Sequence, residues 1–174
     1  MPRVFSIGLA LVVFVLTAST GARAADSVER YEAGPLIGFS AGVFDAIQGN
    51  DMAGLARLEY RENNDWWLKP LVNLTATTDG AVFFSGGLYA ELFLSENLYV
   101  SPSFTPGLFL KGNGQDLGFP LEFRSQFEIG WRFHTGLRFS VSINHISNGG
   151  RARFNPGSES IAISMLIPFD KLFD

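Results

Sequence analysis

Residues 136–169 read GLRFSVSINHISNGGRARFNPGSESIAISMLIPF, two alternating segments joined by a loop rich in glycine and asparagine. In the first segment apolar and polar residues alternate up to Asn144, and a period of two is typical of a β-strand whose faces meet different surroundings. The polar face consists of Arg138, Ser140, Ser142 and Asn144. The apolar face consists of Leu137, Phe139, Val141 and Ile143. His145 and Ser147 continue this apolar face.

The second segment, residues 159–167, has the same parity. Its apolar face consists of Ile161, Ile163, Met165 and Ile167. Glu159 begins that face. Two alternating segments separated by a loop with turn residues are expected to pair as a hairpin. His145, Ser147 and Glu159 would then converge at one end of a single apolar surface.

The first residues are expected to be an export signal. Arg3 supplies a positive charge, residues 4–16 are apolar, and Ala22-Arg23-Ala24 fits a cleavage site with small residues. A transmembrane helix is the rival interpretation, but the apolar run is shorter than the roughly 20 residues that span a bilayer. We therefore predict a signal peptide at residues 1–24 and one folded domain at residues 25–174.

Composition favours an all-β membrane protein. The chain has no cysteine, so disulfides cannot stabilise an exported domain, and its net charge is only -4, with no basic cluster for binding nucleic acid. It has 17 Phe, 4 Tyr and 3 Trp, and the alternating pattern recurs along it. Such a chain is typical of a barrel whose strands turn an apolar face to lipid and a polar face to the lumen. We predict an eight-stranded antiparallel transmembrane β-barrel in the bacterial outer membrane.

The predicted strands cover residues 34–44, 53–60, 66–76, 81–94, 98–110, 121–133, 137–147 and 159–167. Pro70, Pro102 and Pro106 are expected to interrupt the third and fifth strands, since proline cannot donate to a ladder. With an even number of strands and both termini in the periplasm, the loops near residues 48, 78, 114 and 153 lie outside the cell. His145, Ser147 and Glu159 then lie on the lipid-facing wall at the depth of the outer leaflet.

These three side chains suit ester hydrolysis. A serine hydroxyl needs a neighbouring base, and a histidine base works best when an acid orients it. Ser147 would be the nucleophile, His145 the base and Glu159 the orienting acid. Asn148, Gly149 and Gly150 follow at once, and asparagine amides with glycine N–H groups can form an oxyanion hole. A rim histidine and glutamate are more often surface decoration, but polar groups on a lipid-facing wall are costly and indicate function.

The segment His145-Ile146-Ser147-Asn148, with Glu159 twelve residues beyond the serine and an Asn-Pro pair between them, resembles the active-site region of the PagL family of lipid A 3-O-deacylases. The resemblance implies an eight-stranded outer-membrane barrel whose Ser-His-Glu triad removes the ester-linked acyl chain at position 3 of lipid A. It also implies that Asn148 and Gly150 donate to the oxyanion.

Two alternatives remain open from the sequence. A non-enzymatic small barrel for adhesion or anchoring predicts the same fold but no joint role for the three side chains. A lipid A acyltransferase barrel would need a second lipid as acyl donor. A porin is not expected, because eight strands leave little room for a channel. No metal cluster or nucleotide-binding loop is visible, so no cofactor is expected; the expected partners are lipopolysaccharide, the outer membrane and, through lipid-facing Phe and Leu, a second copy of the chain.

Overall fold

The computed structural model describes residues 34–173. The signal peptide predicted at residues 1–24 lies outside the described residues. The described chain is almost entirely strand: β1 Leu36–Phe44, β2 Ala53–Arg61, β3 Lys69–Thr77, β4 Val82–Tyr89, β5 Leu92–Phe93, β6 Leu98–Leu110, β7 Leu121–Arg132, β8 Arg138–Ser147, β9 Ser158–Pro168, and a 3-10 turn η1 Phe169–Lys171. Within this part of the chain, no helix is long and apolar enough to cross a membrane.

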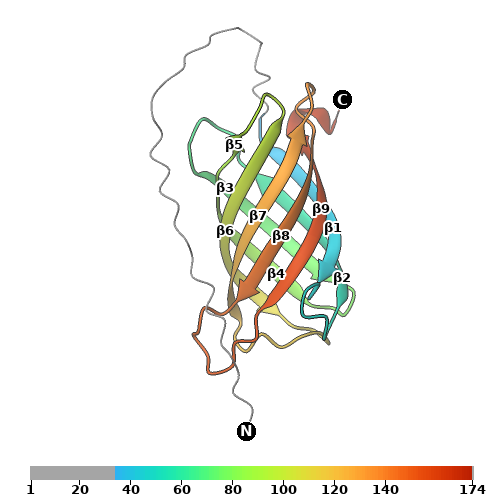
Figure 1. Cartoon of the computed structure of the whole chain (residues 1–174), viewed down its shortest axis with the longest axis vertical. Helices are drawn as coiled ribbons and strands as arrows, with labels where there is room; N and C mark the ends of the chain where they lie inside the picture. The colour runs from blue at the N-terminus through green and yellow to red at the C-terminus, as the bar shows by residue number, and fades with distance from the viewer. Residues whose placement is uncertain (1–33, 174) are drawn as a thin grey trace. The chain divides into compact units, whose positions relative to one another are not determined.

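The strands form one closed antiparallel barrel. Every strand pairs with its sequence neighbour except β4 and β5, which do not pair with each other, and β1 also pairs with β9 (Figure 1). β4 and β5 both pair with β6 and follow one another along it, so together they make one spanning strand. The barrel therefore has eight spanning strands, as the alternating pattern predicts.

The break between β4 and β5 lies opposite Pro102 of the neighbouring strand β6, whereas Pro106 lies opposite the interior of β4. The register places Pro106 of β6 opposite Gly86 and Pro102 opposite Ala90. Neither proline has an N–H to donate, although the Ala90 N–H still donates to the Pro102 carbonyl at 3.0 Å. The predicted interruption of residues 98–110 was therefore wrong in its location: β6 is continuous, and the strand opposite it is interrupted.

The third strand is shorter than predicted. β3 begins at Lys69 rather than at residue 66, and Trp66 and Trp67 lie before it, 64% and 73% exposed. Pro70 belongs to the strand and pairs with Leu88. The turn at residues 62–68 is therefore longer than the sequence indicates, and it places two indole rings on the outside of one rim.

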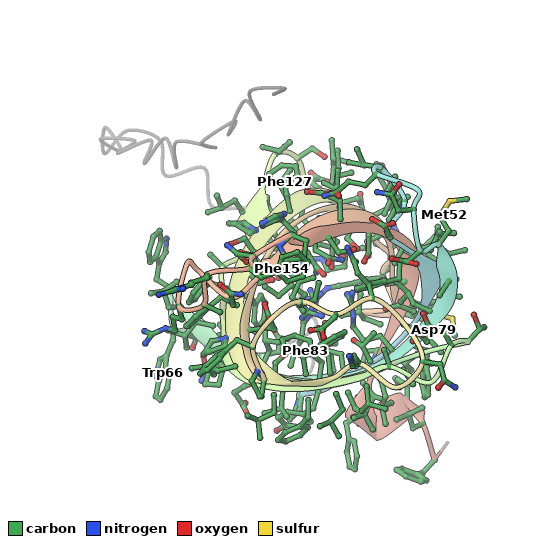
Figure 2. The ribbon with its side chains drawn as sticks, turned by 90° about the horizontal axis from the view of Figure 1, so that it is seen from below. Met52, Trp66, Asp79, Phe83, Phe127 and Phe154 are labelled. Atoms are coloured by element: carbon green, nitrogen blue, oxygen red, sulfur yellow. The ribbon has the colours of Figure 1, made fainter. Side chains whose placement is uncertain are left out.

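Side chains alternate between the lumen and the outer wall as the sequence predicts. In β8 the buried side chains are Arg138, Ser140, Ser142, Asn144 and Ile146, and the exposed ones are Phe139, Val141 and Ile143. Figure 2 shows the same division, with Phe83 inside the ring of strands and Phe127 outside it. His145 and Ser147 are on the outward parity of β8.

Paired charges fill the middle of the lumen. The Arg61 guanidinium contacts Glu59 at 2.5 Å and Glu128 at 2.6 Å, and all three side chains are at most 4% exposed. Tyr99 donates its hydroxyl proton to Glu128 at 2.9 Å. Arg57 donates to Gln126 at 2.7 Å. Buried charges are tolerated when they are paired, as Arg61, Glu59 and Glu128 are here.

The connections at the two rims differ. One rim carries residues 45–52, 78–81, 111–120 and 148–157, and we call it the long-loop rim. It lies at the lower end of the barrel in Figure 1, where β8 ends and β9 begins. The opposite rim carries residues 62–68, 94–97 and 133–137 together with η1.

The lumen network predicts a stability effect. Glu128→Leu removes a carboxylate from Arg61 and leaves a buried cation with one partner, so we expect a loss of about 3–5 kcal/mol in unfolding free energy. Urea unfolding followed by tryptophan fluorescence in lipid vesicles measures it. Ile129→Leu, on the neighbouring outward position, is the control and should change little. A Glu128→Leu barrel as stable as the control would show that the network contributes little.

Candidate active site

His145 and Glu159 are in direct contact on the outer wall. They are register partners across the β8–β9 pair, and the Nδ1 atom of His145 lies 2.9 Å from Glu159 Oε1. The side chains are 40% and 22% exposed, so both are reachable from outside the barrel. When Nδ1 carries the proton and donates it to the carboxylate, the lone pair of Nε2 is free to accept a proton. The pair predicted from the sequence is therefore in the arrangement that a general base needs.

Ser147 lies on the same wall, two residues nearer the rim. Continuing the β8–β9 register by one residue beyond the Ile146–Ser158 pair places Ser147 opposite Gly157. A Cβ atom at Gly157 would lie 2.8 Å from Cε1 and 3.4 Å from Nε2 of His145, so this edge of the ring is directed toward the row that holds Ser147. Among residues 34–173 the Ser147 side chain has no hydrogen-bond partner. Nucleophile–base contacts are often looser in an unliganded enzyme than with substrate present.

A second outward serine lies beside the same histidine. Ser125 of β7 is the register partner of His145 on the side away from Glu159, and it is exposed. The Nε2 edge of His145 lies beside Gly157, which the register places opposite Ser147.

The loop after Ser147 is held by the side chain of Asn148, which is fully buried. Its Nδ2 donates to the Leu117 carbonyl at 2.9 Å and the Phe154 carbonyl at 2.8 Å. Its Oδ1 accepts the Gly150 N–H at 3.0 Å. The predicted oxyanion donors Asn148 and Gly150 are thus bound to each other and to the loops, and the Gly149 N–H is left without a partner among the described residues.

The neighbouring loop, residues 111–120, packs against this one. Gln115 Nε2 donates to the Gly157 carbonyl at 3.2 Å. Two exposed charges of loop 111–120 pair with each other: Lys111 contacts Asp116 at 2.8 Å. Hydrogen bonds from Lys111 and from the Gly118 N–H lower the pKa of Asp116. These charges balance each other beside the site.

Three neighbours of the His145–Glu159 pair were not predicted from the sequence. Gln48 donates to Glu159 from the loop between β1 and β2, Gly157 lies against the His145 ring, and Ser125 lies opposite it. Gly157 is recognisable in the sequence as the last residue of the turn Asn155-Pro156-Gly157, but nothing there links it to His145. Ser125 interrupts the outward apolar row of residues 121–133, which was a readable signal. Gln48 has no local signal, because it reaches the site only through the β1–β9 pairing.

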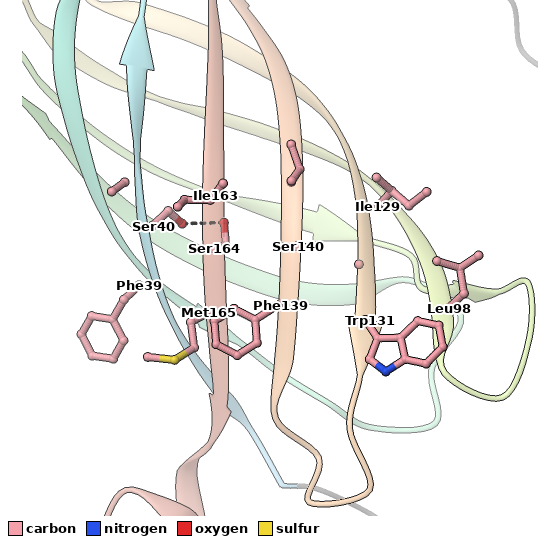
Figure 3. A pocket seen from close by; sticks show the side chains of 13 residues that line it. Phe39, Ser40, Leu98, Ile129, Trp131, Phe139, Ser140, Ile163, Ser164 and Met165 are labelled. Atoms are coloured by element: carbon pink, nitrogen blue, oxygen red, sulfur yellow. Dashed lines mark hydrogen bonds between the residues drawn. The ribbon is translucent and has the colours of Figure 1, made fainter.

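Between the site and the opposite rim, the outer wall is apolar and contains a groove. A groove of about 680 Å³ crosses strands β7, β8, β9 and β1 and also reaches Leu98. Figure 3 shows Phe39, Met165, Phe139 and Trp131 in a row along it. Val141, which lines the groove, is four residues from His145 on β8, about 13 Å at 3.3 Å per residue.

A closed antiparallel barrel with an apolar outer wall and a histidine–carboxylate pair at its rim belongs to the small β-barrels of outer membranes. The family model of lipid A 3-O-deacylase (PagL) matches residues 52–168. The chain therefore belongs to the PagL family, and the resemblance of residues 145–159 is confirmed at the level of the family.

Solved structures agree on the fold. The crystal structure of the outer membrane enzyme PagL has a TM-score of 0.60 and 21% identity, covering 77% of this chain and 99% of its own. De novo designed transmembrane β-barrels have a TM-score of 0.57 and 10% identity, with coverages of 77% and 93%. Neisserial surface protein A (NspA) has a TM-score of 0.51 and 11% identity, with coverages of 78% and 96%. No curated protein sequence matches significantly.

The contact between Gly157 and His145 predicts a local effect. Gly157 has φ +66°, and an added Cβ would collide with the imidazole ring. Gly157→Ala should therefore displace His145 and lower deacylation at least 10-fold while the barrel still folds. Gly80→Ala is the control, since Gly80 has φ +86° with no atom within 4 Å of the added Cβ. Release of fatty acid from lipid A in detergent measures both; equal effects would assign the loss to backbone strain alone.

Proposed function

We propose that this member of the family hydrolyses the ester at position 3 of lipid A with Ser147 as nucleophile, His145 as base and Glu159 as orienting acid. The observation that carries the proposal is the contact between His145 and Glu159 at 2.9 Å, on the outward face of adjacent strands. A carboxylate bound to Nδ1 orients the ring and stabilises the imidazolium that forms when Nε2 takes a proton.

The reaction has two steps. The Ser147 hydroxyl attacks the ester carbonyl carbon while His145 Nε2 takes its proton. The bond from that carbon to the sugar oxygen then breaks, and His145 gives the proton to the sugar oxygen. Water attacks the resulting acyl-serine with His145 again as base, which releases the fatty acid and restores the Ser147 hydroxyl.

The oxyanion formed in both steps needs donors beside Ser147. The Gly149 N–H is the donor that has no hydrogen bond to give up, because it has no partner among the described residues. Asn148 and Gly150 would have to exchange loop hydrogen bonds for bonds to the substrate. We therefore assign the first donor to Gly149 and a supporting role in the loop to Asn148.

The location of the site suits a lipid substrate. The long-loop rim faces the outside of the cell in this proposal, so the triad lies at the headgroup boundary of the outer leaflet. An ester there reaches Ser147 sideways from the membrane, and its acyl chain lies along the wall that leads to the groove of Figure 3. A homodimer stays a prediction of the sequence alone.

The Ser147→Ala variant provides the decisive experiment. Lipid A from outer membranes that contain the wild-type chain should lose one 3-hydroxyacyl chain by mass spectrometry, and membranes with the variant should keep it. Ser125→Ala, the exposed serine on the other side of His145, is the matched control and should retain activity within about twofold.

Other outcomes separate the alternatives. A gain of one acyl chain would identify an acyltransferase. Unchanged lipid A with a folded wild-type barrel, both in membranes and in detergent, would contradict the deacylase. Loss of activity in Ser125→Ala with retention in Ser147→Ala would reassign the nucleophile.

A further inference from the structure

The Glu159 carboxylate is held from two sides. One oxygen, Oε1, contacts His145 at 2.9 Å. The other oxygen, Oε2, accepts a hydrogen bond at 3.4 Å from Nε2 of Gln48, in the loop between β1 and β2. The same loop also binds the backbone of Glu159, because the Ala46 N–H donates to its carbonyl at 2.8 Å. The loop is therefore docked on Glu159 by a main-chain and a side-chain contact.

The shape of this loop is set by Asp45. Its carboxylate is fully buried, and Oδ2 accepts the N–H groups of Asn50 and Asp51, each at 2.8 Å. The Gly49 N–H donates to the Asp45 carbonyl at 3.0 Å. Within residues 34–173, Asp45 is the one non-glycine residue with positive φ, at 54°. Such a conformation persists only where surrounding bonds enforce it, and here it turns the chain so that Gln48 reaches Glu159.

A neutral amide is suited to this position. It fixes the second carboxylate oxygen without neutralising the charge that stabilises the imidazolium. A lysine or arginine there would compete with His145 for the carboxylate. A carboxylate that is 22% exposed and had no second partner would rotate more freely and orient the histidine less well.

We propose that Gln48 is a positioning residue of the active site: it orients the Glu159 carboxylate and, through it, the His145 ring, and Asp45 holds the loop that presents it. The inference rests on the proposed function, in which His145 and Glu159 act together. Gln48, Ala46 and Asp45 precede residue 52, where the match to the family model begins, so that match does not include this loop.

The first test reads the histidine directly, without activity. The chain has two histidines, so His134→Asn leaves His145 as the one imidazole in a 15N spectrum of the detergent-solubilised barrel. In this background Gln48→Ala should shift the Nδ1 and Nε2 resonances of His145. Asn50→Ala, a truncation in the same loop whose side chain makes no hydrogen bond to any described residue, should not. His145 resonances that are unchanged in Gln48→Ala would overturn the proposal, whether or not the barrel is a deacylase.

The second test is a double-mutant cycle on lipid A hydrolysis. Gln48→Ala should lower kcat about 3- to 10-fold with KM within twofold, and in the Glu159→Gln background it should have no further effect. Asp45→Ala should lower kcat by the same factor as Gln48→Ala, and the double variant Asp45→Ala/Gln48→Ala should lose no more than either one. A full additive loss in the Glu159→Gln background would show that Gln48 acts elsewhere, and a wild-type kcat in Gln48→Ala would also overturn the proposal. Activity in Ser147→Ala would instead defeat the proposed function.

Discussion

Inside a lipid bilayer every backbone N–H and C=O group must find a partner within the protein, and the rest of this structure depends on that requirement. An open sheet would expose the edges of its first and last strands. The pairing of β1 with β9 removes these edges, and the pairing of β4 and β5 with β6 carries the ladder past two prolines. Where Pro102 removes a donor, the Ala90 N–H still reaches its carbonyl, so the closed barrel tolerates the proline.

Closure also separates the lumen from the outer wall, and polar side chains are tolerated in these two environments for different reasons. In the lumen, the buried Arg61 side chain is stabilised by ion pairs with Glu59 and Glu128. On the outer wall, polar side chains are expected only where they have a task. His145 and Glu159 are partners of each other there, close to the rim, and both are partly exposed. In the proposed function, this position on the outside of a filled barrel gives the site a substrate that moves within the membrane.

The site depends on strands from both ends of the chain. β9 lies between β8 and β1, so Glu159 meets His145 on one side and the loop of Gln48 on the other. Asn148 ties the loop after Ser147 to the loop that precedes β7. The designed barrels resemble this fold more closely than NspA does, with TM-scores of 0.57 and 0.51, so the fold alone does not define a function.

The sequence by itself determined the all-β class, the number of spanning strands, the direction of each side chain along β8 and β9, and the shared face of His145, Ser147 and Glu159. These follow from a period of two, which is local in the chain. Only the tertiary structure decided the start of β3, the location of the break opposite Pro102, the use of the Asn148 amide within the loops and the contact of Gln48 with Glu159. These depend on register and closure between distant segments, which no local pattern encodes.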